Sequence, residues 1–423
     1  MTDIATPAHT HGRGQAGSRE LVAIIVGLMM TTSFAIDLML PAFPDIRRAF
    51  GMAADSTQVT ATITAYFYGL AIGPWLYGPA SDRFGRRRPL YVGLSVCVVA
   101  SALAALAPVW WMVVAARFLW GLGAGAPRTL AAAIIRDRYE GNTMARMMSL
   151  IIAVFMLAPV VAPMLGAGLI ELFPWQSVFW FPVILSGAML LWLRRLPETL
   201  PPERRRSMDP RSVRAAIAEV LRTPQTMWLT LAMTVSTGIL TGFIGASQVI
   251  VEDVFDRADL FAPCFAGIAV LMGLNSLLTA RRVRRRGAEH VLRRNVIAAV
   301  ISAAAFLVVV EFSSDTPNFG LFLGVWALAM AIAQSVNPTC FALAMAPLPH
   351  IAGTTSSVIA TITAAGGATM GGIAANAFDG TARPYVRFFL AYTVISALMA
   401  LWALRNATTD ANMVTVTEII AEA

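Results

Sequence analysis

The chain has 423 residues, of which 57% are hydrophobic and only 13% charged, with a mean hydropathy of +0.67. Because soluble domains carry about 25% charged residues, this composition predicts an integral membrane protein. The formal net charge of +8 comes from 32 basic residues that are all arginine, and their position in short loops favours membrane topology over nucleic-acid binding. The three cysteines are isolated in separate apolar runs and the four histidines lie in the N-terminal tail and loops, so we expect no disulfide framework and no metal site.

Residues 1–19 are polar and glycine-rich, without a small-residue cleavage site, and predict a disordered cytoplasmic tail before a retained first helix. Twelve apolar runs follow, each long enough to cross a bilayer as a helix. They cover residues 20–42, 57–80, 89–107, 110–135, 143–170, 175–193, 226–250, 261–280, 291–311, 318–345, 352–377 and 385–404. A proline- and arginine-rich cytoplasmic linker, 194–225, separates a six-helix bundle over 20–193 from a second over 226–405, and a cytoplasmic tail over 406–423 ends the chain.

The distribution of arginine predicts which side of the membrane each loop faces, because cytoplasmic loops carry an excess of Lys and Arg. If both termini are cytoplasmic, 25 of the 32 arginines fall in cytoplasmic segments and five in periplasmic ones. We therefore expect both termini in the cytoplasm. Two six-helix halves joined by a cytoplasmic linker are typical of transporters whose halves move about a site near the bilayer midplane.

A polar turn with the sequence GPASDRFGRRRP, residues 78–89, separates the second and third apolar runs. Four arginines, one aspartate and helix-breaking Gly and Pro are unsuited to hydrocarbon, so this turn belongs at a membrane surface. It either fixes topology alone or forms a latch, in which arginines and the start of the next helix hold the carboxylate of Asp82. The spacing of Asp82 and a glycine three residues on favours the latch. The predicted latch residues are Gly78, Asp82, Arg83, Gly85, Arg86 and Arg87.

Charged side chains inside predicted membrane helices are costly and usually functional. Asp37 lies about five residues, or roughly 7–8 Å, from the outer end of its run, and Arg117 lies at a similar depth in the fourth run. The two could pair, or exchange partners when a proton or a substrate arrives. Alternatively, Asp37 reaches the periplasmic headgroup layer and Arg117 pins backbone carbonyls of neighbouring helices.

Arg128 follows Arg117 by eleven residues, which returns it to within about 20° of the same helix face, roughly 16 Å further along. Pro127 and Gly125 loosen the turn between them. If this face lines a cavity, it favours an anionic or polyoxygenated substrate. Otherwise Arg128 extends to the cytoplasmic surface or pairs with a helix end.

The fifth run contains Pro159 and Pro163, each of which removes an internal hydrogen bond and bends the helix. Gly166 and the small residues around it allow close approach of a neighbouring helix. The eleventh run, the corresponding segment of the second half, contains glycine pairs at 366–367 and 371–372. We interpret both segments as a bendable seam between the halves, with simple helix packing as the alternative.

Several of these segments resemble one family. The turn over 78–89 resembles the signature between helices 2 and 3 of the major facilitator superfamily, Arg117-Phe118-Leu119-Trp120-Gly121-Leu122-Gly123 resembles its helix 4 signature, and the fifth run resembles the helix 5 signature of twelve-helix proton antiporters. Further segments are similar to the Bcr/CflA branch of drug:proton antiporters (bicyclomycin and chloramphenicol resistance). They are Ile36-Asp37 with Leu40-Pro41-Ala42, Arg136-Asp137-Arg138-Tyr139, Arg146-Met147-Met148-Ser149, Trp175 with Phe179-Trp180, and Glu198-Thr199-Leu200-Pro201-Pro202-Glu203-Arg204-Arg205. The resemblance is dense over residues 30–206 and mostly topological beyond them.

The resemblance implies that Asp37 is the proton-coupling carboxylate, that Arg117 regulates it, and that the turn latches the outward-open state on the cytoplasmic side. The sequence also departs from the branch. Pro74 stands where Gln is frequent, Trp120 where Gln or His is frequent and Met39 where Tyr is frequent, while Arg128 has no usual counterpart. These departures affect the expected substrate more than the mechanism and would fit a narrower substrate range.

We therefore expect a proton-driven multidrug exporter of small amphipathic compounds, an antibiotic-resistance transporter working by alternating access as a monomer in the bacterial inner membrane. Its partners would be a small-molecule substrate, protons and the lipid bilayer, with no nucleic acid, and the proton motive force would drive it without a cofactor. The alternatives are a narrow exporter of an endogenous metabolite such as a siderophore, an uptake symporter, a membrane sensor that transports nothing, and a membrane enzyme. The enzyme is disfavoured because no cluster of His, Cys and carboxylates is present. The candidate substrate-cavity residues are Met39, Trp120, Arg128, Gln334 and Asn337.

Overall fold

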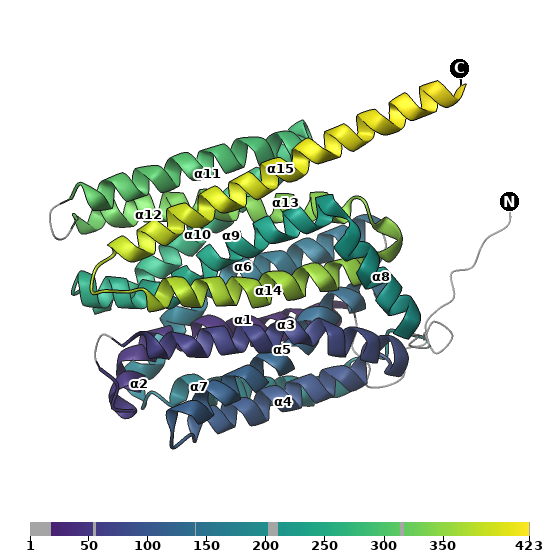
Figure 1. The fold of residues 1–423 in the computed structure, drawn as a ribbon. Coiled ribbons are helices and arrows are strands. Elements are labelled where there is room, and N and C mark those ends of the chain that lie inside the picture. Colours follow the sequence, from purple (N-terminus) through teal and green to yellow (C-terminus); the bar gives the residue numbers. More distant parts are fainter. Residues whose placement is uncertain (1–17, 54–55, 140, 202–209, 314–316, 423) are drawn as a thin grey trace.

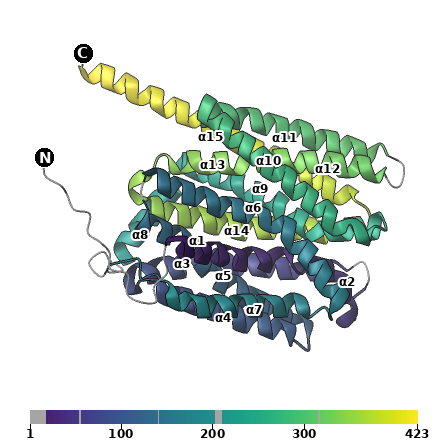
Figure 2. The same ribbon diagram turned by 180° about the vertical axis from the view of Figure 1, so that it is seen from behind.

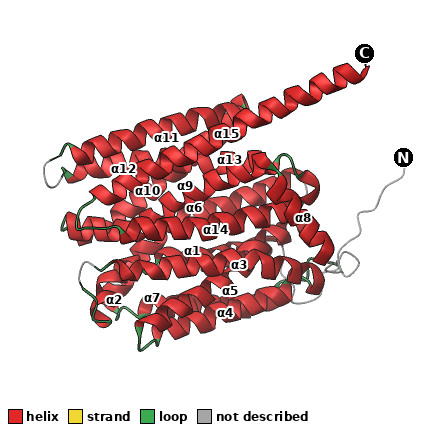
Figure 3. Ribbon diagram, viewed as in Figure 1, coloured by secondary structure: helices red, strands yellow, loops and turns green. Residues whose placement is uncertain are grey.

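Helices make up all the regular structure in the part of the chain that the computed structural model describes, residues 18–53, 56–139, 141–201, 210–313 and 317–422 (Figure 3). The first seven are α1 (Ser18–Asp37), α2 (Phe43–Ala49), α3 (Ala61–Phe84), α4 (Arg87–Ala105), α5 (Trp110–Arg138), α6 (Gly141–Leu172) and α7 (Ser177–Trp192). The others are α8 (Pro210–Arg222), α9 (Pro224–Val249), α10 (Phe261–Arg286), α11 (Ala288–Glu311), α12 (Phe319–Gln334), α13 (Val336–Met345), α14 (Ala352–Asn376) and α15 (Arg383–Glu422).

Ten helical segments are long and apolar enough to cross a membrane, and a shorter apolar stretch, Leu157–Leu172, lies in α6. The prediction of an all-helical membrane protein is therefore confirmed for the described residues. The predicted N-terminal tail lies outside them up to residue 17. In the predicted linker, α8 is an additional helix, and in the predicted C-terminal tail α15 continues as far as Glu422.

The first predicted membrane helix is shorter than expected. The apolar run over 20–42 forms α1 only as far as Asp37, and a 3-10 turn, Leu40–Ala42, then leads into α2. A proline ring collides with the carbonyl of the residue four positions before it and lacks the N–H that would bond there. Pro41 stands four residues after Asp37, so Asp37 becomes the last residue of the helix instead of an interior one.

The run predicted over 318–345 is broken for the same reason. It forms α12, which ends at Gln334, and α13, which begins at Val336. Pro338 stands four residues after Gln334 and interrupts the hydrogen bonds at that point. Both breaks place a polar side chain at a helix end inside the bundle.

The helices form two groups that lie one above the other in Figures 1 and 2, with α1, α3, α4, α5 and α7 in the lower group and α9 to α15 in the upper one. Within the lower group α5 packs against α1, α3 and α4, and within the upper group α9 packs against α13, α14 and α15. The groups meet along two seams. In one, α3 packs against α14, and in the other α6, which packs against α1 of the lower group, also packs against α10 of the upper group. The seam helices therefore carry any movement of one group relative to the other.

Glycines bring α3 and α5 into close contact. A Cβ atom on Gly121 would lie 1.9 Å from the carbonyl oxygen of Tyr66, and one on Gly69 would lie 2.0 Å from the carbonyl oxygen of Phe118. Because only hydrogen fits at these positions, the two backbones approach closely, as small residues permit in membrane helix pairs. This packing sets Arg117, one turn before Gly121, against α3.

We expect Gly121→Ala to lower the stability of the folded protein by about 1–3 kcal/mol, because the added methyl group must push α3 and α5 apart. The midpoint of thermal unfolding in detergent micelles measures the effect. Gly187→Ala in α7 is the matched control, because a Cβ there meets nothing within 4 Å, and it should change stability by less than about 0.5 kcal/mol. Equal midpoints for both variants would contradict the close α3–α5 contact.

Candidate functional site

Arg117 joins three helices in the interior of the lower group. Its side chain, on α5, is 0% exposed. Nη1 donates a hydrogen bond to the carbonyl oxygen of Ala35 on α1 at 2.5 Å, and Nε donates to the carbonyl oxygen of Thr62 on α3 at 3.4 Å. The last four carbonyl groups of a helix lack partners within the helix. Because Pro41 ends α1 at Asp37, the carbonyl of Ala35 is available to Arg117.

Asp37 is buried beside this arginine but is not paired with it. Its side chain is 3% exposed, and neither its Oδ1 atom nor Nη2 of Arg117 has a hydrogen-bond partner. The two side chains are close enough to interact electrostatically, yet no ion pair joins them among the described residues. Of the two sequence interpretations of Arg117, the structure shows the one in which it pins backbone carbonyls of neighbouring helices.

Two aromatic rings flank the guanidinium group. The Cζ atom of Arg117 lies 4.7 Å from the centre of the Tyr66 ring and 4.9 Å from that of Trp120. The rings themselves meet edge to face with their centres 6.4 Å apart, so they form a corner around the cation. Such cation–π contacts are stronger where water is excluded. Tyr66 is fixed in turn, because its hydroxyl donates to the carbonyl oxygen of Thr32 at 3.0 Å.

The five predicted cavity residues lie in different surroundings. Met39 and Trp120 are 2% and 1% exposed and belong to the apolar core. Arg128 is exposed, although the five residues before it on α5 are buried. Gln334 and Asn337 are half-buried at the break between α12 and α13, where Asn337 Nδ2 donates to Gln334 Oε1 at 3.0 Å and Gln334 Nε2 donates to the carbonyl oxygen of Ser236 at 3.2 Å.

The predicted latch forms a network centred on Arg86. Its guanidinium donates to Asp82 Oδ1 at 2.6 Å, to Asp137 Oδ2 at 2.8 Å and to the hydroxyl of Ser81 at 2.7 Å. Burial lowers the pKa of Arg86, but the hydrogen bonds and charges of Asp137 and Asp82 outweigh burial and raise it. Asp82, Asp137 and Ser81 all belong to the first half of the chain.

Glu198 completes the network from the linker. Its Oε1 accepts the backbone N–H of Arg86 at 2.8 Å and its Oε2 that of Arg87 at 3.3 Å, at the start of α4. Gly85, with φ +85°, allows this approach, because a Cβ there would lie 2.4 Å from Glu198 Oε2. The sequence prediction did not assign Asp137 or Glu198 to the latch. Both residues nevertheless lie in segments that resemble the Bcr/CflA branch, Arg136–Tyr139 and Glu198–Arg205.

The other predicted latch residues, and the residues of the fifth run that were predicted to form a bendable seam, have local contacts. Arg83 lies over the ring of Phe84, with 5.1 Å from Cζ to the ring centre, and the carbonyl of Gly78 accepts the Ser81 hydroxyl at 2.8 Å. Pro159 and Pro163 both lie inside α6, which remains one helix. Gly166 brings α6 close to the end of α1, because a Cβ there would lie 2.1 Å from the carbonyl oxygen of Leu38.

Arg47 forms an ion pair between the two halves that the sequence did not reveal. It lies on α2 and is 3% exposed. Its Nη1 lies 3.2 Å from Asp253 Oδ2, and its Nη2 donates to Gln248 Oε1 at 3.4 Å. Asp253 belongs to a π-helical turn, Ile250–Val254, at the end of α9, and Gln248 also bonds Glu252 in that turn. π-helical turns are frequent at functional sites.

The α3–α14 seam between the halves is polar along its length. Thr57, which lies just before α3 begins, donates from Oγ1 to Asn376 Oδ1 at the end of α14, at 3.1 Å. Further along, the hydroxyls of Tyr68 and Thr369 lie 2.8 Å apart, and Trp75 Nε1 donates to Thr361 Oγ1 at 2.5 Å. The Thr57 bond and the Arg47 ion pair hold the halves together at the end of the bundle that carries α2, and the Trp75 bond lies toward the opposite end, where Trp75 also packs beside Ile217 of α8 (Figure 1).

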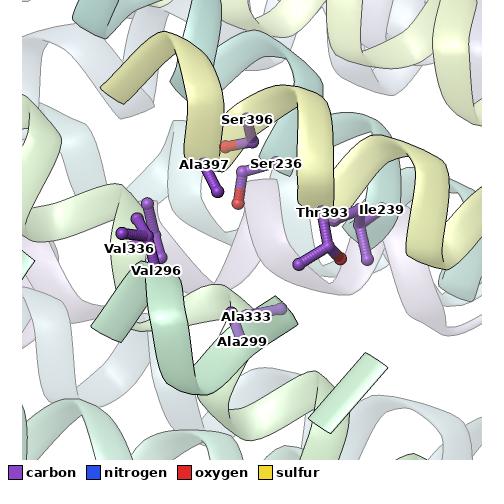
Figure 4. Close-up of a pocket in the computed structure, with 9 residues that line it drawn as sticks. All are labelled: Ser236, Ile239, Val296, Ala299, Ala333, Val336, Thr393, Ser396 and Ala397. Carbon is purple, nitrogen blue, oxygen red and sulfur yellow. The ribbon is translucent and has the colours of Figure 1, made fainter. Parts of the chain in front are cut away.

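A small cavity lies in the second half, beside the break between α12 and α13 where Gln334 bonds the carbonyl of Ser236 (Figure 4). Its volume is about 10 Å³, which is room for about one water molecule. Its walls come from α9, α11, α12, α13 and α15, and the hydroxyl of Ser236 in its lining has no hydrogen-bond partner. A cavity of this size cannot hold a drug-sized ligand.

The sequence matches the family model of the Major Facilitator Superfamily over residues 23–371. It is 29% identical over 381 residues to a bicyclomycin resistance protein homologue of Haemophilus influenzae, a match that covers 88% of this chain and 92% of that protein. It is 30% identical over 349 residues to an uncharacterized MFS-type transporter of Bacillus subtilis, YdgK, covering 81% and 85%. It is 33% identical over 236 residues to the multidrug resistance protein MdtL of Escherichia fergusonii, covering 54% and 59%.

Solved transporter structures share the fold. The human organic anion transporter MFSD10 superposes with a TM-score of 0.69 at 20% identity, over 92% of this chain and 100% of that one. A D-xylose–proton symporter superposes with a TM-score of 0.70 at 16% identity, over 91% and 96%. The resemblance inferred from the motifs is confirmed by the family match and by the similarity to a bicyclomycin resistance homologue. The chain is a member of the Major Facilitator Superfamily of transporters.

Proposed function

We propose that the protein is a proton-coupled exporter that moves small amphipathic compounds across the bacterial inner membrane by alternating access. The family and the names of the relatives from Haemophilus influenzae and Escherichia fergusonii support export of drug-like compounds. The observation that carries proton coupling is the buried, unpaired carboxylate oxygen of Asp37 beside Arg117. Carboxyl groups inside a membrane bundle are rare and usually mark a functional site.

The proposed topology has twelve membrane helices with both termini in the cytoplasm. Ten are the segments with sufficient length and hydropathy. α3 and α6 complete the set, because they form the two seams with α14 and α10 and so lie between helices that themselves span. The helical pair α12 and α13 counts as one span. The excess of arginine in alternate loops supports the orientation.

The contacts of Arg117 suggest how a proton on Asp37 changes the structure. Asp37 can gain or lose a proton without breaking an ion pair, because it forms none with a described residue. Arg117 holds the carbonyls of Ala35 and Thr62, so a change in its attraction to Asp37 acts directly on α1 and α3. α3 also forms the seam with α14. A protonation event at the end of α1 can therefore be passed to the contact between the halves.

Arg128 suggests the chemical nature of the substrate. It is exposed on a helix whose preceding residues are buried, and it shares a helix face with Arg117. An exposed arginine within a membrane bundle can bind a carboxylate or phosphate group of a substrate through two parallel hydrogen bonds. A substrate with an acidic group, or a narrow range of such substrates, fits this position better than a purely cationic drug.

Replacing Asp37 tests proton coupling. In inverted membrane vesicles acidified inside by respiration, we expect addition of a transported compound to release protons, and Asp37→Asn to abolish the release because an amide cannot carry the proton. A panel of phenicols, sulfonamides, nucleosides and siderophores supplies the compounds. Asp45→Asn is the control, since Arg48 on the same short helix is the one ion-pair partner of Asp45 among the described residues. A response that survives in Asp37→Asn refutes the role of Asp37, and silence of the wild type across the panel refutes a broad drug exporter.

Replacing Arg128 tests the charge of the substrate. We expect Arg128→Gln to raise KM for acidic substrates about tenfold or more, because a charge-assisted hydrogen bond is lost, and to leave KM for neutral substrates within about twofold. Arg136→Gln removes an exposed arginine two turns later on the same helix and should affect neither class. Equal effects of Arg128→Gln on acidic and neutral substrates would show that Arg128 does not select for charge.

Replacing Arg47 tests whether the ion pair closes one end of the transporter. We expect Arg47→Gln to speed labelling of Ser247→Cys by a membrane-impermeant maleimide, in a variant without the three native cysteines, because Ser247 is only 2% exposed beside Gln248. The loss of hydrogen bonds to a charged group, about 1.5–3 kcal/mol, corresponds to a rate increase of roughly 10–150-fold. Arg48→Gln removes an arginine with 79% side-chain exposure and should leave the labelling rate unchanged. Similar labelling rates in both variants would show that the Arg47–Asp253 ion pair does not close this end of the transporter.

A further inference from the structure

The two halves of the chain contain the same helix–glycine–helix turn. α3 ends before Gly85, with φ +85° and ψ 167°, and α10 ends before Gly287, with φ +79° and ψ 157°. In each case the next helix begins within two residues of the glycine, α4 at Arg87 and α11 at Ala288. The turns therefore have nearly the same backbone geometry and arginine-rich sequences, and they differ in the groups around them.

In the first half, carboxylates of the chain itself occupy the turn. Asp82 and Asp137 pair with Arg86, and Glu198 accepts backbone N–H groups at the start of α4. A Cβ on Gly85 would collide with the Glu198 carboxylate. The charge of Arg86 is therefore balanced within the protein, whereas the side chains of Arg83, Arg87 and Arg88 form no ion pair with a described residue.

In the second half, the corresponding positions have no such groups. A Cβ on Gly287 would meet nothing within 4 Å, and no side chain caps the start of α11. Seven arginines lie within residues 281–294, against one carboxylate, Glu289. None of the seven belongs to an ion pair between described residues, and all except Arg282 are exposed. We name this set the α10–α11 arginine cluster: Arg281, Arg282, Arg284, Arg285, Arg286, Arg293 and Arg294.

An exposed apolar face leads directly to the arginine cluster. On α10, Leu274 and Leu277 are 53% and 57% exposed, and they share a helix face with Arg281, seven and four residues later. On α11, Ile297 and Ile301 are 56% and 65% exposed, and they share a face with Arg293 in the same way. The two helices are consecutive and pack against each other (Figures 1 and 2). Arginines at one end of an exposed apolar surface match the charge and shape of an anionic phospholipid.

We propose that the α10–α11 arginine cluster binds the phosphate of an anionic phospholipid, whose acyl chains lie on the exposed apolar faces of α10 and α11. Arginine guanidinium groups bind phosphate in a bidentate manner, and each basic residue near a membrane surface adds to the attraction of anionic lipid. The site takes a lipid of the surrounding bilayer and is separate from the proposed substrate path. It stands whether or not the protein exports drugs.

The test is lipid retention by the purified full-length protein. Native mass spectrometry from micelles containing equal phosphatidylglycerol and phosphatidylcholine should show preferential retention of phosphatidylglycerol. The triple variant Arg281→Gln, Arg285→Gln, Arg293→Gln should lower phosphatidylglycerol affinity roughly a hundredfold, from about fivefold for each arginine. The control triple variant Arg48→Gln, Arg257→Gln, Arg383→Gln removes the same charge from positions outside the cluster and should retain the lipid as the wild type does.

A variant that increases binding separates the site from a folding defect. Glu289→Gln removes the one carboxylate within residues 281–294 and should raise phosphatidylglycerol affinity about twofold, because the like-charge repulsion between this carboxylate and the lipid phosphate is lost. Equal retention of both lipids, or full retention by the triple variant, would show that the cluster serves topology alone. Displacement of the lipid by equimolar glycerol 3-phosphate would show that the apolar faces contribute nothing, and would also overturn the proposal.

Discussion

The interior of the first half depends on the hydrogen bonds of one arginine. A buried guanidinium group is strongly destabilising unless acceptors and favourable surroundings compensate for its lost hydration. Arg117 finds acceptors on two other helices, at Ala35 and Thr62, and a corner of two aromatic rings. These contacts tie α1, α3 and α5 together at the depth of Asp37. The position of that carboxyl group therefore follows from where the backbone of α1 ends.

A single proline sets this arrangement. Pro41 ends α1 at Asp37, which frees the carbonyl of Ala35 for Arg117 and places the carboxyl group at a helix end. Gly166 then brings the proline-containing helix α6 against the carbonyl of Leu38, immediately after Asp37. Because α6 also forms the seam with α10, the end of α1 contacts a helix that joins the two halves. Packed helices, and not a series of ion pairs, therefore connect the proposed proton site to the α6–α10 seam.

The sequence predicted the helices well because a bilayer demands about 20 apolar residues for each span, a pattern that is local. The shortening of two helices was also readable, from Pro41 and Pro338, but the continuous apolar runs concealed it. The proximity of Asp37 and Arg117 followed from counting residues along the helices. The choice of backbone carbonyls over Asp37 as partners of Arg117 depends on three-dimensional packing. The Arg47–Asp253 ion pair joins residues 206 positions apart, and no local pattern could reveal it.

The two ends of the bundle carry different polar networks, and the one at the α2 end joins the halves. At the end that carries α2, Arg47 and Asp253 connect one half to the other, so this end opens only when an ion pair between the halves breaks. The Arg86 network lies within the first half and the adjoining linker, so it cannot itself hold the halves together here. The side chain of Asp82 is 51% exposed, and so it can turn from Arg86 toward another partner. A latch for a second conformation would therefore require Asp82 to change partners, while Asp137 and Glu198 keep Arg86 and the start of α4 in place.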